Sequence, residues 1–187
     1  MRKVTAGLFI SLDGVVESPE NWQLPYFNDE MGEAVGAAMA AADAMLLGRV
    51  TYQEFASYWP GVTSEDQPFA GYMNDTPKYV VSASLDTVDW SNSTLIRGNL
   101  AEEITRLKQR PGRNIGITGS ATLVRSLLQE DLLDELVLMV HPVVVGSGRR
   151  LFTEGGDLKE LNLVDSKTFG TGVVSLTYQP AGKEEEG

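Results

Sequence analysis

Residues 117–123 read Ile-Thr-Gly-Ser-Ala-Thr-Leu, and they indicate an α/β architecture because they join a buried strand to a helix through a glycine. Residues 46–52, Leu-Leu-Gly-Arg-Val-Thr-Tyr, repeat the same form earlier in the chain. Strands that alternate with helices in this way pair in parallel through right-handed crossovers. Taken singly, each turn is equally well explained as an ordinary strand-to-helix connection with no ligand.

Outward from these two turns, apolar and β-branched runs predict more strands, and amphipathic runs with capping residues predict the helices between them. Asn28 is placed to cap one helix, and Asn99 with Glu102 has the form of a capping box for another. Residues 14–27 contain glycine, two prolines and three aromatic residues, and are expected to form a long loop that serves as a lid. The expected strands are 4–10, 44–47, 79–82, 94–97, 115–118, 135–140, 161–168 and 173–179.

The order of these elements predicts an α/β fold. Its mostly parallel, mixed sheet carries helices on both faces and ends in an antiparallel hairpin around residues 169–172. No internal repeat or Gly/Pro/Ser-rich linker divides the chain. We therefore expect a single domain over residues 1–180, followed by a disordered acidic tail over residues 181–187.

The composition excludes several classes of function. The 187 residues carry a net charge of −11, which disfavours nucleic acid and anionic membrane surfaces as partners. The chain has no cysteine and a single histidine, His141, so no metal site is expected. No apolar run reaches the length of a membrane span, and the lack of cysteine fits a cytoplasmic protein.

Both glycine turns have the features of a phosphate-binding site. A glycine at the end of a strand lets the backbone approach a ligand closely, and the following helix points its N–H groups and positive dipole end outward. In the first turn, Arg49 adds a guanidinium fork suited to phosphate oxygens, and the Thr51 hydroxyl can donate a hydrogen bond. Two such turns on one sheet suit a dinucleotide, because it carries a pyrophosphate and, in NADP, a further ribose phosphate.

Five motifs follow one another in a specific order: Ser11–Gly14, Leu47–Tyr52, Ser82–Ser84, Thr118–Ala121 and His141–Phe152. In this order and spacing, the chain resembles the reductase domain of the bifunctional riboflavin-biosynthesis deaminase-reductase, over roughly residues 2 to 180. The resemblance implies a dihydrofolate-reductase-like fold, NADPH as the cofactor and a homodimer.

The resemblance also assigns roles along the chain. Ser11 is expected beside the nicotinamide, and residues 146–152 are expected to border the site. Gly48, Arg49 and Thr51 are expected to hold phosphate, with Ser82, Ala83, Ser84 and Arg97 around the adenosine ribose and its 2′-phosphate, and Gly119, Ser120, Ala121, Thr122 and Leu123 around the pyrophosphate. From the residues alone, Ser82–Ser84 is equally explained as a polar turn.

Asp13 and Glu30 are the catalytic candidates. Asp13 follows the first strand and can orient a substrate hydroxyl, or alternatively close a turn before Gly14. Glu30 lies close to the place, about Gly32, where dihydrofolate reductase holds its pterin with a carboxylate. His141 is either a proton donor or a structural residue at a strand end, and Trp22, Tyr26 and Phe27 form either a wall for a flat ring or a packed lid.

The chain departs from the resembled family in two ways. It has none of the histidine, glutamate and cysteine signatures of the deaminase domain. Thr118 stands where that family has an acidic residue, and Ser120 replaces the second glycine of its Gly-Gly pair. These differences put riboflavin-pathway activity in doubt.

The expected function is hydride transfer from NADPH to a small substrate, either a pterin- or pyrimidine-like heterocycle or a carbonyl compound. The alternatives are a non-catalytic module that binds a nucleotide or pterin on the same fold, and a purely structural or protein-interaction domain.

Overall fold

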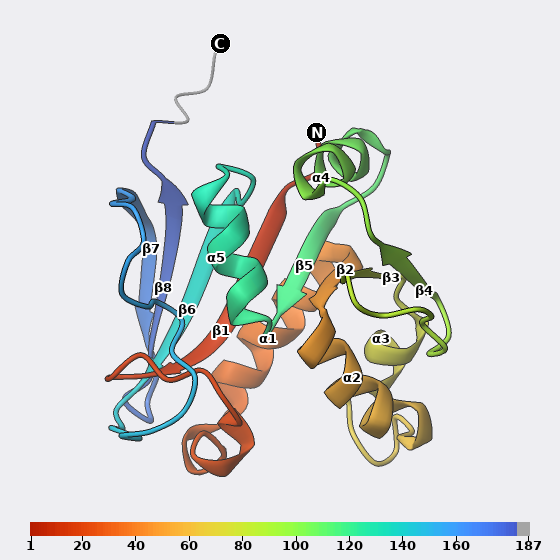
Figure 1. The fold of residues 1–187 in the computed structure, drawn as a ribbon. Coiled ribbons are helices and arrows are strands. Elements are labelled where there is room, and N and C mark those ends of the chain that lie inside the picture. The colour runs from red at the N-terminus through yellow and green to blue at the C-terminus, as the bar shows by residue number, and fades with distance from the viewer. Residues whose placement is uncertain (183–187) are drawn as a thin grey trace.

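The computed structural model describes residues 1–182 and contains one mixed sheet of eight strands in the order β4-β3-β2-β5-β1-β6-β8-β7. All pairings among β1 to β6 are parallel, whereas β8 pairs antiparallel with both β6 and β7 (Figure 1). The strands are β1 (Val4–Ser11), β2 (Ala42–Gly48), β3 (Lys78–Val81), β4 (Ser93–Ile96), β5 (Asn114–Thr118), β6 (Glu135–His141), β7 (Leu161–Thr168) and β8 (Val174–Pro180).

The helices begin where the sequence provides caps. Asn28 Oδ1 accepts a hydrogen bond from the Met31 N–H at 3.1 Å, and Asn99 Oδ1 accepts one from the Ala101 N–H at 3.0 Å. The α-helices are α1 (Asp29–Ala41), α2 (Arg49–Tyr58), α3 (Ala70–Asp75), α4 (Leu100–Gln109) and α5 (Ala121–Gln129), and the short 3₁₀ turns are η1 (Pro19–Asn21), η2 (Leu24–Tyr26) and η3 (Trp59–Gly61).

Helices cover both faces of the sheet, and the core lies on both sides of it. Figure 1 shows α5 in front of the sheet and α1 behind it. Successive residues of β2 belong to core clusters on opposite faces of the sheet. Leu46 packs with apolar residues of α4 and α5, whereas Met45 and Leu47 pack with Tyr52 of α2. A third, smaller cluster around Met31 and Met139 lies where α1 begins beside the tip of the β7–β8 hairpin.

These observations confirm the predicted fold class, including the mostly parallel sheet, the helices on both faces and the C-terminal antiparallel hairpin. The sequence did not predict α3 or the two 3₁₀ turns inside the loop of residues 14–27. From residue 183 onward, the predicted tail lies outside the described residues. Among residues 1–182, no helix combines the length and the apolar character that a membrane crossing requires.

The carboxyl ends of the parallel strands form a stepped edge. β5 stops at Thr118, which pairs with Gly7, whereas β1 continues to Ser11, which pairs with His141 of β6. β1 leads into α1 on one face and β5 leads into α5 on the other, so the chain diverges between two neighbouring strands. In open α/β sheets, ligands bind at such a divergence.

Candidate functional site

The two glycine turns meet at the carboxyl edge of β2 and β5. The Gly48 N–H donates to Ser120 Oγ at 2.9 Å, and the Ser120 N–H donates to Thr51 Oγ1 at 3.0 Å. Gly119 has φ +71°, and a Cβ on it would lie 3.2 Å from Thr51 Cγ2. Backbone conformation and close packing therefore both require glycine at this position.

The first turns of α2 and α5 supply hydrogen-bond donors. The N–H groups that open a helix have no acceptor within it, and no side chain of the described residues caps either of these two helices. Arg49 is exposed at the start of α2, where its Nη1 donates to Gln53 Oε1 at 3.1 Å. Thr51 is buried and accepts from Ser120, which leaves its hydroxyl hydrogen to donate. Two adjacent helix N-termini and a guanidinium fit the oxygens of a pyrophosphate.

The turn after β3 and the end of β4 continue this edge. Ser82 Oγ accepts from the N–H groups of Ser84 and Leu85 at 3.2 and 3.0 Å. The Arg97 guanidinium donates to the carbonyls of Leu85 and Asp86 from its half-exposed position. Ser82 and Arg97 thus shape this turn, while Ala83 and Ser84 face solvent. The part predicted for these residues in binding a 2′-phosphate stays a prediction.

Just after β1, the Asp13 side chain connects the end of this strand to the distant segment of residues 145–150. Its carboxylate accepts hydrogen bonds from Ser11 Oγ at 2.6 Å, the Val145 N–H at 3.0 Å and the Gly146 N–H at 2.8 Å. The Arg150 guanidinium lies 3.6 Å away. The hydrogen bond from Ser11, with those from Val145 and Gly146, holds the pKa of Asp13 far below its usual value, so this carboxyl is ionised at neutral pH. The Ser11 hydroxyl is engaged in the same contact.

Replacing Asp13 by Asn should lower the melting temperature at pH 7, because the amide cannot accept all of these hydrogen bonds. A depressed carboxyl pKa stabilises the fold above the unfolded value of 3.8, and this stabilisation is lost as the pH falls through the folded value. The Tm difference between wild type and D13N should therefore shrink as the pH is lowered from 7 towards 3. E33Q, at an exposed position, is the control; a Tm difference for D13N that is independent of pH would contradict this assignment.

Glu30 lies at the start of α1 and fastens the tip of the β7–β8 hairpin. Its Oε2 accepts from the Gly170 N–H at 2.7 Å and from Asn28 Nδ2 at 3.2 Å. The Gly170 contact is the main reason that the pKa of Glu30 is lowered. Both catalytic candidates are thus ionised carboxylates held by backbone N–H groups, and their catalytic roles stay predictions.

The sequence left two explanations open for His141, as a proton donor or as a structural residue at a strand end. It also left two open for the aromatic residues of the loop, as a wall for a flat ring or as a packed lid. The imidazole is fully buried, and its Nδ1 donates to the Met139 carbonyl at 2.8 Å. The rings of Phe9, Trp22 and Tyr26 meet it edge to face, with centroid distances of 5.5, 5.2 and 5.9 Å. A lone histidine at a strand end was visible in the sequence, but its aromatic surroundings come from segments far apart in the chain.

The structure therefore brings the predicted residues of the two glycine turns into direct contact. Gly48 and Thr51 contact the turn at Gly119 and Ser120.

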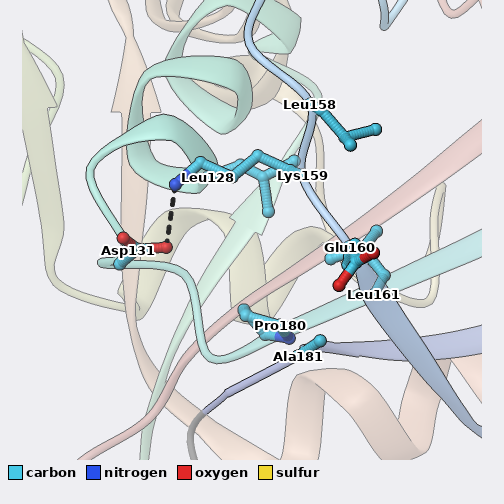
Figure 2. Close-up of a pocket in the computed structure, with 8 residues that line it drawn as sticks. All are labelled: Leu128, Asp131, Leu158, Lys159, Glu160, Leu161, Pro180 and Ala181. Atoms are coloured by element: carbon cyan, nitrogen blue, oxygen red, sulfur yellow. Dashed lines mark hydrogen bonds and ion pairs between the residues drawn. The ribbon is translucent and has the colours of Figure 1, made fainter.

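A cleft of about 350 Å³ lies away from these turns, between the end of α5, the start of β7 and the end of β8. Figure 2 shows this cleft with the ion pair between Lys159 Nζ and Asp131 at 3.0 Å. It adjoins the start of β6 rather than its carboxyl end, and none of the predicted site residues lines it.

Comparisons with known proteins identify the family of the chain. Residues 2–175 match the family model described as the RibD C-terminal domain. The uncharacterized protein YwjB of Bacillus subtilis (strain 168) is 32% identical over 175 residues, covering 92% of this chain and 95% of YwjB.

Two solved structures share the fold. One is a protein of Shewanella sp. PV-4 whose name refers to riboflavin biosynthesis. Its TM-score is 0.78 and its sequence identity is 23%, and the match covers 95% of this chain and 98% of that one. The riboflavin biosynthesis reductase Rib7 of Saccharomyces cerevisiae has a TM-score of 0.61 and 17% identity, over 96% of this chain and 90% of that one. The chain has the α/β fold of these two proteins, and it belongs to the RibD C-terminal domain family.

Proposed function

We propose that this protein is an NADPH-dependent reductase that acts on a small pterin- or pyrimidine-like heterocycle or a carbonyl compound. The observation that carries the proposal is the joining of two helix N-termini through Gly48, Thr51 and Ser120 at the divergence of the sheet. Family membership supports a riboflavin-pathway reductase fold for the chain. The resemblance also leads us to propose a homodimer, and the lack of cysteine leads us to propose a cytoplasmic location.

The residues present fit a dinucleotide. The N–H groups that open α2 and α5, with the Arg49 guanidinium, would hold the pyrophosphate, because they combine donors, positive dipole ends and one full charge. Ser84 and the outer edge of the Arg97 guanidinium would hold the 2′-phosphate. NADPH, when bound, supplies the hydride.

The protein's own residues would orient the substrate and keep water away from it. The end of β1 at Ser11, fixed by Asp13, gives the reacting rings a rigid floor. The segment of residues 18–27 covers the neighbouring end of β6 with aromatic side chains. Orientation and exclusion of water are the main contributions that a protein makes to a hydride transfer.

A non-catalytic module that binds a nucleotide or pterin is the second candidate. It is favoured by one observation: the carboxylates of Asp13 and Glu30 already accept backbone hydrogen bonds and are ionised. Neither carboxyl therefore holds a proton to donate at neutral pH. Consumption of NADPH in the presence of a pterin, flavin-like or carbonyl acceptor would distinguish the enzyme from the module.

Calorimetric titration with NADPH and NADH tests the cofactor site directly. We expect micromolar binding of NADPH and at least tenfold weaker binding of NADH. R49A should weaken both about five- to tenfold, since it removes one charge-assisted contact, whereas R97A should weaken NADPH alone and erase the preference.

R106A is the control, because within residues 1–182 Arg106 pairs only with Glu103 and Glu102 on the exposed face of α4. Absence of binding by either nucleotide would overturn the proposal and leave the fold to serve another ligand or a protein partner.

A further inference from the structure

The Nε2 atom of His141 is a buried acceptor without a partner. Burial lowers the pKa of His141, so the ring is neutral at physiological pH. Its single N–H is on Nδ1 and donates to the Met139 carbonyl, which leaves a lone pair on Nε2. Among the described residues, Nε2 has no hydrogen-bond partner. A hydrogen bond between the ring and the Ile10 carbonyl favours the protonated form of His141, but in the neutral ring this carbonyl is an acceptor and cannot donate to the Nε2 lone pair.

Two further unpartnered oxygens belong to segments that meet at His141. Within residues 1–182, four buried side-chain polar atoms lack a partner, and Gln23 Oε1 and Thr171 Oγ1 are two of the remaining three. Gln23 follows Trp22, whose ring contacts His141. Thr171 precedes Gly172, where a Cβ would lie 3.7 Å from the ring of Pro142. Buried polar atoms without partners are uncommon, so three from segments that converge on one strand end point to a ligand.

The aromatic side chains around His141 suit a flat ring. Phe9 of β1 and Trp22 and Tyr26 of the loop each meet the imidazole edge to face. Aromatic side chains offer faces on which a planar heterocycle stacks, while the few polar atoms among them fix its orientation.

The segment that covers His141 is attached to the rest of the protein by packing alone. In the described part of the chain, the hydrogen bonds of residues 18–27 run within the segment or to the neighbouring Glu17 carbonyl. Ser18, at its start, has a left-handed backbone with φ 44°. Leu24, within the segment, is exposed. The segment can therefore lift as a unit without breaking hydrogen bonds to the sheet.

We propose that His141 Nε2 is the specificity-determining acceptor of a substrate subsite, where it receives a hydrogen bond from an amino N–H of a flat heteroaromatic ring. The ring enters when residues 18–27 lift, packs against Phe9, Trp22 and Tyr26, and offers its donor edge to His141. A compound of the same shape without an N–H donor leaves this acceptor unpaired and is rejected.

This inference rests on the proposed function for the nature of the substrate, but its test does not depend on NADPH. His141 is the only histidine in the chain, so its ring nitrogens give unambiguous signals in ¹⁵N NMR of the full-length protein. The probes are 4-aminopyrimidine and, as a matched compound without the amino donor, pyrimidine. We expect 4-aminopyrimidine to move the Nε2 resonance in a saturable manner while the Nδ1–H tautomer is retained, and pyrimidine to move it little.

Two substitutions separate a binding role from a structural one. The amide of H141N can keep the donation to the Met139 carbonyl but loses the acceptor at the Nε2 position, whereas H141Q keeps a polar group at that position. We expect H141N to weaken 4-aminopyrimidine at least tenfold and H141Q to stay within about threefold of wild type. NADPH affinity should not change in either variant, because its predicted site lies at α2 and α5.

Three outcomes would overturn the inference: no movement of the Nε2 resonance with 4-aminopyrimidine, equal movement with both compounds, or equal affinity of H141N and wild type. Failure of the proposed function gives a different result, in which NADPH does not bind but the His141 signals still respond to 4-aminopyrimidine. The wild-type NMR titration remains decisive if either variant fails to fold.

Discussion

Replacing Lys78 by methionine should destabilise the protein by about 1–3 kcal/mol, the cost of leaving buried carbonyl groups without a hydrogen-bond donor. Lys78 is the first residue of β3 and is only 1% exposed. Its Nζ donates to the carbonyls of Asn74, Thr76 and Ser91 at 3.0, 2.8 and 3.2 Å. The ammonium group also lies 4.3 Å from the centre of the Trp90 ring. Methionine fills similar space but leaves three carbonyls without their donor.

Urea denaturation measures this loss, with K3M at an exposed position of the same residue type as the control. Lys78 also gives a pH signature. Burial lowers its pKa from 10.5 to about 8, so between these values the unfolded chain binds more protons and stability rises with pH. This rise should be smaller in K78M than in wild type. A loss below 1 kcal/mol, or an unchanged pH profile, would show that the ammonium is not integral to the fold.

Replacing Gly119 by alanine should weaken NADPH binding about 30-fold or more, which corresponds to about 2 kcal/mol of binding free energy. The new Cβ would lie 3.2 Å from Thr51 Cγ2 and 3.4 Å from Thr51 Oγ1. Thr51 must then move, and with it the hydrogen bond from the Ser120 N–H that sets the first turn of α5. The positive φ adds about 1–2 kcal/mol of strain in the free protein.

G36A is the matched control for this substitution. Gly36 lies inside α1, and a Cβ there would meet no heavy atom within 4 Å. Alanine should therefore raise stability by about 0.5–1 kcal/mol and leave NADPH binding unchanged. Unchanged NADPH affinity in a folded G119A protein would place the cofactor elsewhere.

The sequence predicted the features that depend on neighbouring residues. The caps at Asn28 and Asn99, the helix starts after Gly48 and Gly119, and the final hairpin all follow from local patterns, and the structure has them. The order of strands within the sheet was not predicted, because it depends on which strands pair across more than 100 residues, as Val4 does with Ile115.

The sequence could not predict the contacts that define the site. Ser120 was assigned to the pyrophosphate, but its side chain accepts from Gly48, 72 positions away. Asp13 was considered as a local turn residue, and its main contacts outside that turn are backbone N–H groups more than 130 positions later. A lysine at a strand start gives no sign that it will be buried, as Lys78 is, because its acceptors come from α3 before the strand and from the turn after it.

The central position of β1 has a consequence for the order of folding. β1 is synthesised before the other described strands, and it pairs on one side with β5 and on the other with β6, which begin at Asn114 and Glu135. Until about two thirds of the chain has been made, this apolar strand has neither neighbour. Parallel pairing over such distances is slow, and exposed strands in that interval are prone to association. Truncated chains that end before β5 should therefore need a chaperone to remain unaggregated, whatever the stability of the finished protein.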